Sequence, residues 1–159
     1  MTLATRFGRN SNALRSNIPL DNSQLFRIAP SIFANEAHKS RSSRYTYIPT
    51  IDILDGLKKE GFQPFFVAQS RSRIEGKSEF TKHMLRLRQI NEIEISEANE
   101  IILINSHDGT SSYQMMAGCF RFVCQNGMVT GDIVEDIRVR HKGNIIHNVI
   151  VPALLVIIR

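Results

Sequence analysis

Two apolar runs, residues 101–104 and 111–124, dominate the centre of the chain, and Asp108-Gly109 lies between them. Asn126-Gly127 follows the second run. Asp-Gly and Asn-Gly pairs between apolar runs are strong hairpin signals, because both central residues of a type I′ turn need a positive φ. The pattern predicts two successive hairpins at the centre of an antiparallel sheet.

Other segments also have the pattern of strands. Residues 65–73 (FFVAQSRSR) form a predicted strand with Pro64 at its first position, where proline is tolerated. Residues 80–90 alternate with period two, which fits a strand better than a helix. Further candidates are the short segment 45–48 and residues 132–140. In the 80–90 strand, one face carries His83, Leu85 and Leu87 and the other carries Met84, Arg86 and Arg88.

Capping signals predict the helices. Asp21 is placed to cap a short helix that ends before Pro30, and Thr50 is the predicted N-cap of a helix over 51–60, with Gly61 after its end. A C-terminal helix is expected from residue 144. These elements predict an α+β fold, an antiparallel hairpin-rich sheet with a few packing helices. The predicted organisation is a flexible, basic and irregular arm over 1–19, one domain over 20–148 and an apolar tail over 149–159.

Composition narrows the class of protein. The chain has 159 residues, 42% of them apolar, which suffices for one domain with a real core. The N-terminus has no apolar signal region. The longest apolar stretch, 149–158, contains Pro152 and is too short to span a membrane, which needs about 20 residues. We therefore expect a cytoplasmic protein without a membrane segment.

The two cysteines, Cys119 and Cys124, do not make a disulfide framework. Residues five apart on one strand point to opposite faces, so a bridge between them would need a bend. Buried free thiols, which fit a reducing compartment, are the favoured interpretation.

Positive charge is the first candidate for chemistry. The formal net charge is +5, which suits an anionic partner, nucleic acid first. Arginines two apart on neighbouring strands project together, as on a sheet that contacts a phosphate backbone while aromatic residues such as Phe65 or Tyr113 stack on bases. The alternative is the solvated outer face of a half-buried sheet. The predicted nucleic-acid contacts are Arg71, Arg73, Arg86 and Arg88, assisted by Arg41, Arg44, Arg138, Arg140 and Lys142.

A second candidate is the turn Asn105-Ser106-His107-Asp108, which places a hydroxyl, an imidazole and a carboxylate together. Neighbours in a tight turn rarely converge on one reacting atom, and these residue types also satisfy a turn's own hydrogen bonds, so a structural turn is favoured. No histidine pair has the spacing of a metal motif, and no phosphate-binding glycine loop occurs. No metal or cofactor is predicted. The possible site residues are His83, Asn105, Ser106, His107, Asp108 and His141.

Several segments, taken together, resemble one family. They are SRSSRYTYIPT, EGFQPFFVAQSRSR, TKHMLRLR, EIILINSHDGTSSYQM, CFRFVCQNG and RVRHKG. They resemble the YfjQ/YafZ-like proteins, in the phage- and plasmid-encoded group named domain of unknown function 932. The resemblance implies a role in the life of mobile DNA and supplies no catalytic residues. Family members continue past the HKG segment, whereas this chain turns into VPALLVIIR and stops. We therefore expect a truncated member.

Three functions follow as hypotheses. The leading one is a non-enzymatic, DNA-associated accessory protein of a mobile element that favours single-stranded DNA. The second is a protein that binds and antagonises a host defence complex. The third, ranked last, is a metal-dependent hydrolase that uses the Ser106–Gly109 turn.

Overall fold

The computed structural model describes residues 2–3, 11–34, 49–71, 81–105, 113–122 and 129–139. Side chains are not described for 2–3, 11, 113, 122 and 129–139. Four predictions lie outside the described residues: the strand over 45–48, the turns at 108–109 and 126–127, and the C-terminal helix.

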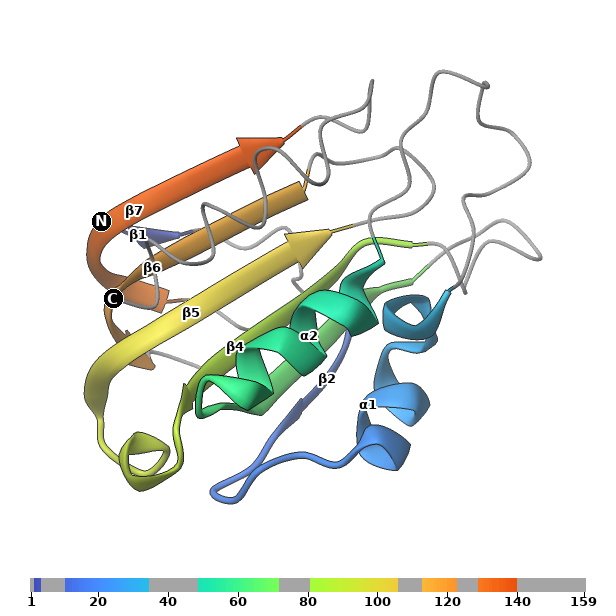
Figure 1. Cartoon of the computed structure of the whole chain (residues 1–159), viewed down its shortest axis with the longest axis horizontal. Helices are drawn as coiled ribbons and strands as arrows, with labels where there is room; N and C mark the ends of the chain where they lie inside the picture. The colour runs from blue at the N-terminus through green and yellow to red at the C-terminus, as the bar shows by residue number, and fades with distance from the viewer. Residues whose placement is uncertain are drawn as a thin grey trace.

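The described strands form one 7-stranded antiparallel sheet in the order β1-β7-β6-β5-β4-β3-β2 (Figure 1). Strands β3 to β7 follow one another as a meander, so the predicted pairing of the central strands is confirmed. Together with the helices, this sheet confirms the α+β fold. The strands are β1 (Thr2–Leu3), β2 (Ser11–Arg15), β3 (Phe62–Ser70), β4 (His83–Gln89), β5 (Glu97–Asn105), β6 (Tyr113–Phe122) and β7 (Val129–Val139).

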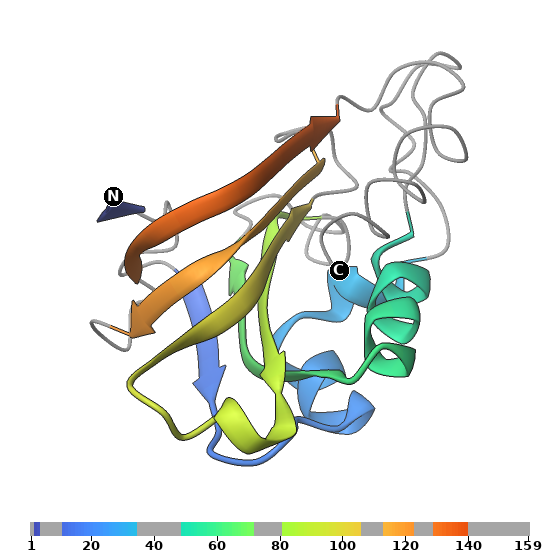
Figure 2. The same ribbon diagram turned by 60° about the vertical axis from the view of Figure 1, so that its left-hand side comes forward.

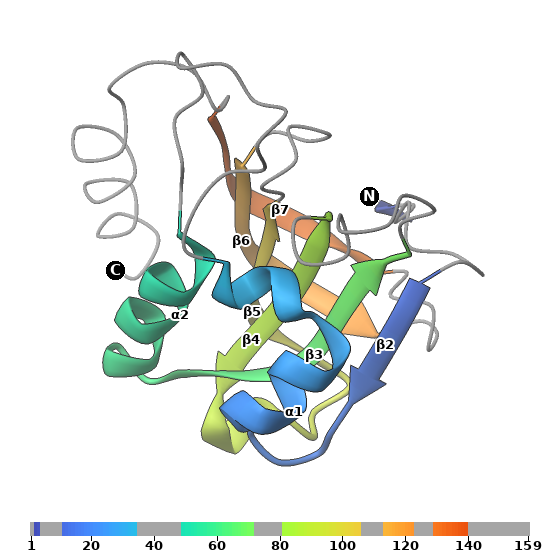
Figure 3. The same ribbon diagram turned by 90° about the vertical axis from the view of Figure 1, so that its right-hand side faces the viewer.

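Two helices lie against one face of the sheet (Figure 3). Helix α1 (Asn22–Ile28) begins with the predicted cap, because the Asp21 side chain accepts from the Gln24 N–H and the Gln24 side chain accepts from the Asp21 N–H. Helix α2 (Thr50–Lys59) ends before Gly61, whose φ of +92° confirms the predicted C′ glycine. A 3₁₀ turn, η1 (Pro30–Phe33), follows α1 and packs in the same core cluster as the two helices.

The sheet is strongly curled. Strands β1 and β2 are the two ends of the 7-stranded order, yet only residues 4–10 separate them in the chain. A flat sheet of this size would be about 29 Å wide, and a fully extended linker of this length reaches roughly 28 Å. A curled sheet shortens the distance that the linker between β1 and β2 has to span. β2 folds back toward β6 and β7 on the side away from α2 (Figure 2). We call this side the concave face and the other the helix-covered face.

Both faces of the sheet carry a core. The helix-covered face packs α1, η1 and α2 on alternate residues of the central strands, among them Leu85 and Leu103. The concave face carries a second cluster: Phe65, Phe66, Ala68, Met84, Ile93, Ile102, Met116 and Phe120. Strand β4 is buried on both faces over its first six residues. The expectation of a half-buried sheet with a solvated outer face is therefore wrong for this strand.

Three predictions of local structure need correction. The predicted irregular arm over 1–19 contains β1 and β2, because residues 11–15 pair with β3. Pro64 is the third residue of β3 and lies at a β-bulge, which places Phe65 and Phe66 in the same apolar cluster. Thr50 is the first residue of α2 and makes no capping hydrogen bond; Pro49 precedes the helix as its cap residue.

Neither α-helix of the described ranges is long and apolar enough to cross a membrane.

Candidate functional site

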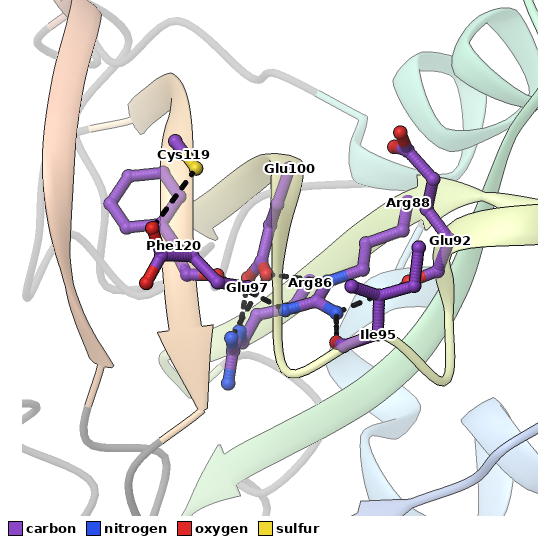
Figure 4. A network of polar contacts seen from close by, with 8 residues as sticks. All are labelled: Arg86, Arg88, Glu92, Ile95, Glu97, Glu100, Cys119 and Phe120. Carbon is purple, nitrogen blue, oxygen red and sulfur yellow. Dashed lines mark hydrogen bonds and ion pairs between the residues drawn. The ribbon is translucent and has the colours of Figure 1, made fainter.

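A fully buried charge cluster lies on the concave face (Figure 4). Arg86 and Arg88 come from β4 and share the carboxylate of Glu100 in β5, and all three side chains have 0% exposure. Glu100 lies directly opposite Arg88 in the strand register and diagonal to Arg86. Arg86 binds both carboxylate oxygens, through Nε to Oε1 and through Nη2 to Oε2 at 2.9 Å, and Arg88 Nε donates to Oε2 at 2.9 Å. We call these three residues the arginine–glutamate cluster.

Arg88 also fixes the turn between β4 and β5. Its Nη1 donates to the carbonyl oxygens of Glu92 (3.2 Å) and Ile95, and its Nη2 donates to the carbonyl oxygen of Phe120 on β6 (3.2 Å). The planar guanidinium group suits this work because it presents several donors in a fixed fork. One buried side chain therefore ties the turn, β5 and β6 together.

Aromatic rings complete the surroundings of this cluster. The Phe65 ring centroid lies 5.2 Å from Arg86 Cζ and 4.8 Å from Arg88 Cζ, and Phe66 lies 5.8 Å from Arg86 Cζ. The bulge at Pro64 brings both rings to these guanidinium groups. Phe65, expected to stack on bases, is fully buried and stacks on arginine instead.

The predicted exposed arginine face is therefore wrong for two of its four members. Arg86 and Arg88 lie inside the molecule, so they form neither a phosphate-contacting surface nor a solvated one. Arg71 is exposed just beyond the end of β3, where its Nε donates to Asn12 Oδ1 at 3.4 Å. Asn12 pairs with Gln69, which lies on the helix-covered face, so Arg71 and the buried pair belong to opposite faces.

An arginine missing from the predicted set, Arg15, lies at the edge of the concave face. Register places it beside Phe66, which is itself beside Arg86, so Arg15 is the outer, exposed member of this row. Partial burial lowers the pKa of Arg15, and the guanidinium groups of Arg86 and Arg88 lower it further, while Glu100 acts in the opposite direction. Arg15 was missed because residues 1–19 showed no strand pattern.

A second buried polar cluster lies on the helix-covered face. His83 of β4 is hydrogen-bonded on both ring nitrogens, Nδ1 to Ser31 Oγ (2.8 Å) and Nε2 to Thr50 Oγ1 (2.8 Å). Asn105 Nδ2 donates to Thr50 Oγ1 at 3.0 Å, and Ser31 Oγ donates to Gln69 Oε1 at 2.7 Å. All five residues are buried. We call them the His83 network.

The hydroxyl hydrogen of Ser31 fixes the direction of one end of this network. Ser31 gives its one hydroxyl hydrogen to Gln69, so its oxygen accepts from His83 Nδ1–H. Thr50 Oγ1 accepts from Asn105 Nδ2 and is also hydrogen-bonded to His83 Nε2. The five side chains therefore form one connected series of hydrogen bonds from Asn105 to Gln69. Connected hydrogen bonds of this kind strengthen one another in a buried environment.

Two of the predicted possible-site residues, His83 and Asn105, are thus brought together through Thr50. Sequence reasoning missed Ser31, Thr50 and Gln69 as members of one cluster, because they come from three distant segments of the chain. Within the described ranges, no group of three or more His, Cys, Asp or Glu residues could hold a metal ion. Cys119 is a half-buried thiol whose Sγ donates to Glu97 Oε1 at 3.7 Å.

The remaining predicted residues stay predictions. Arg138 lies on β7 opposite Gln114, and its side chain is not described. The others lie outside the described residues, so the hydrolase hypothesis based on the turn after Asn105 also stays a prediction. They are Arg41, Arg44, Arg73, Ser106, His107, Asp108, Arg140, His141 and Lys142.

These two clusters belong to an α+β domain of a known sequence family. The chain belongs to the family described as "Domain of unknown function (DUF932)", whose model matches residues 37–155. The resemblance found from the sequence segments is confirmed.

Two relatives from Escherichia coli (strain K12) are similar in sequence to most of this chain. UPF0380 protein YafZ is 56% identical over 148 residues, which cover 93% of this chain and 54% of YafZ. UPF0380 protein YfjQ is 55% identical over 148 residues, with the same shares of 93% and 54%. The chain thus spans about half the length of these curated relatives. No solved structure matches it.

Proposed function

We propose that this chain is a non-enzymatic nucleic-acid-binding accessory protein of a mobile element, and that it contacts single-stranded DNA through exposed cations at the β2–β3 edge of the sheet. The observation that carries the proposal is the placement of Arg15 and Arg71, both exposed, at this edge. The buried arginines have a structural role and are not contacts.

The charge balance supports an anionic partner. Arg86 and Arg88 withdraw two positive charges from the surface and Glu100 withdraws one negative charge, so the remaining residues keep a net charge of +4 of the original +5. Residues 1–20 contain three arginines and no acidic residue. Burial of the arginine–glutamate cluster therefore removes little of the attraction for phosphate.

The position of the two cations favours a single strand over a duplex. Arg15 belongs to the concave face and Arg71 to the helix-covered face, so a ligand that contacts both has to pass around the edge strand β2. A single strand can bend in this way, whereas a duplex is stiff over roughly 150 base pairs. The resemblance to mobile-element proteins also fits a protein that encounters single-stranded DNA.

The test is fluorescence-polarisation binding to single- and double-stranded oligonucleotides of equal length across a salt series. Each phosphate contact on single-stranded DNA contributes a slope of about −0.7 to the dependence of log K on log salt. Replacing Arg15 and Arg71 by Ala should weaken binding and reduce the slope by about 1.4. Arg121→Ala is the matched control, because this exposed arginine is already paired with Glu97 at 3.0 Å.

Binding that is insensitive to salt, or equal in the double variant and the control, would contradict the proposal. An Arg86→Ala/Arg88→Ala variant is unsuitable for this test, because loss of the buried cluster would unfold the protein and remove binding for an unrelated reason.

A second candidate function, binding of a host protein, is favoured by the β4–β5 turn. Ile90 and Ile95 are exposed there at 67% and 48%. Ile93 is buried in the concave-face core, and Arg88 holds the turn's carbonyl groups, so the two isoleucines are presented in a fixed arrangement. Preorganised apolar side chains are typical of interface anchors. The neighbouring Glu94 is exposed, which suits a partner with an apolar face and a basic rim.

This candidate is tested with Ile90→Ser/Ile95→Ser in a nuclease-treated host lysate. Capture of a specific protein should be lost in this variant and retained in Phe26→Ser, which removes another exposed apolar side chain, 57% exposed. Equal capture by both variants would place the interface elsewhere. Capture that occurs in untreated lysate and disappears on nuclease treatment would instead support binding through nucleic acid.

A further inference from the structure

The β4–β5 turn and helix α1 present opposite charges next to exposed apolar side chains. On the turn, Glu94 is exposed, and Ile90 and Ile95 have exposed fractions of 67% and 48%. On α1, Arg27 is exposed and follows Phe26, which is 57% exposed. Within the described residues, neither Glu94 nor Arg27 forms an ion pair. Each surface thus combines an apolar contact with a charge that is available for an ion pair.

Both surfaces lie at the same end of the molecule, where β3 begins (Figures 1 and 3). Phe62, the first residue of β3, pairs with Gln89, the last residue of β4 before the turn. The Leu20 N–H donates to the Pro64 carbonyl oxygen at 2.8 Å, shortly before α1 begins. Helix α1 has seven residues and is about 10 Å long, so Arg27 stays near this end. A two-fold axis through this end brings the turn of each copy to α1 of the other.

We propose that this end binds a second copy of the chain, in a closed two-fold dimer in which Glu94 of each copy pairs with Arg27 of the other. In a two-fold interface every contact between unlike surfaces is made twice. Ile90 and Ile95 then lie against Phe26 of the other copy, and burial of these side chains supplies the main attraction. The ion pairs fix the orientation of the two copies.

The charges decide which surfaces meet. Residues 90–99 contain three glutamates and no basic residue, so two copies of the turn repel each other. Helix α1 supplies the positive charge that complements the turn. Arg88 holds the carbonyl groups of the turn, so association requires little ordering there. Ile18, 68% exposed on the segment that joins β2 to α1, adds apolar area at the same end.

The dimer goes beyond the function proposed above and does not depend on it. Each dimer carries two β2–β3 edges. A DNA strand that reaches both edges binds with the added strength of two linked sites.

The first test is sedimentation velocity of the purified chain over a concentration series. The mass should rise from that of one chain to that of two as concentration increases, and no further. Ile90→Ser/Ile95→Ser should raise the dissociation constant of the dimer by about tenfold or more, because it removes the apolar contact. Phe26→Ser should have an effect in the same direction.

The second test exchanges the charges. Glu94→Arg and Arg27→Glu each place like charges opposite each other, so each should weaken association by about tenfold. An equimolar mixture of these two variants, or one chain with both substitutions, should associate as the wild type does, which also shows that the variants are folded. Arg71→Glu is the matched control, because this exposed arginine lies beyond the other end of β3. It should associate normally and should not rescue Glu94→Arg.

Three results would overturn the dimer: a single-chain mass at every concentration, association that neither the turn variants nor the α1 variants weaken, and charge exchange without rescue. A mass that rises beyond two chains would overturn the closed arrangement. The functions proposed above fail separately. A chain that stays monomeric but loses capture of a host protein in Ile90→Ser/Ile95→Ser would remove the dimer and leave the second candidate function. Dimers that bind no DNA would keep the dimer and remove the DNA-binding function.

Discussion

The two buried polar clusters lie on opposite faces of the same strand, β4, and they differ in charge and in origin. The arginine–glutamate cluster joins three ionised side chains from two neighbouring strands. The His83 network joins an imidazole, two hydroxyl groups and two amide groups from η1, α2, β3, β4 and β5. The arginine–glutamate cluster fixes the register of β4 and β5 and the turn between them. The His83 network holds η1 and α2 against the sheet. The comparison shows that one alternating strand can serve two unlike structural purposes.

The largest expected effect comes from removing the shared carboxylate. Glu100→Gln keeps the shape of the side chain but leaves two buried guanidinium groups without their counter-charge, so it should lower the free energy of unfolding by about 3–5 kcal/mol. Urea unfolding monitored by circular dichroism measures this. Glu97→Gln is the control, because its ion pair with Arg121 is 48% and 63% exposed and is worth at most about 1 kcal/mol. Equal losses would show that the buried cluster does not depend on charge.

Arg88→Lys separates the charge of the cluster from its hydrogen-bonding geometry. Lysine keeps the positive charge but cannot reach the carbonyl oxygens of both the turn and β6, so we expect a loss of about 3 kcal/mol. Hydrogen exchange should show faster exchange of the Ile95 amide, which donates to the Glu92 carbonyl at 3.2 Å. Unchanged protection of that amide would mean that the turn is stable without Arg88.

Thr50→Val is the matching test of the His83 network. It removes the hydroxyl group that accepts from Asn105 and binds His83, at nearly constant volume, and should cost about 2 kcal/mol in the free energy of unfolding. Thr50→Ser keeps the hydroxyl group and should cost less than about 1 kcal/mol. The expectation would be wrong if serine and valine destabilised the protein equally, since the methyl group would then matter more than the network.

The smallest effect is expected where neither cluster is touched. At Gly61, with φ of +92°, an added Cβ would lie 2.8 Å from Gln89 Oε1, so Gly61→Ala should cost about 1–2 kcal/mol. At Gly56, inside α2, an added Cβ meets nothing within 4 Å, so Gly56→Ala should stabilise by about 0.5–1 kcal/mol. Thermal unfolding of the two variants gives opposite shifts. Shifts of the same sign would contradict this assignment of backbone strain.

Much of the fold could be predicted from local pattern. Signals within a few residues predict three features: the helix after Asp21, the helix that ends before Gly61 and the strand over 80–90. The alternation correctly separated His83 from Arg86 and Arg88. Strand β2 was missed because SNALR has no run of apolar or β-branched residues, and pairing with β3 stabilises it instead.

The candidate site was harder to predict because its members are distant in sequence. A pairing of 83–89 with 97–105 would have placed Glu100 opposite Arg88, so the signal was present once the register was known. Ser31 and Gln69, 38 residues apart, meet only when η1 packs on β3. No local pattern relates such residues.

By itself, the sequence determined the order and type of most elements, the positive charge of the chain and the family to which it belongs. Only the tertiary structure decided that both faces of β4 are covered. Alternation along a strand shows that its two faces differ in polarity. How many of these faces are covered depends on how the sheet curls and which segments pack on it. Here the short connection from β1 to β2 and the pairing with Glu100 place two arginines inside the molecule and leave Arg15 at its margin.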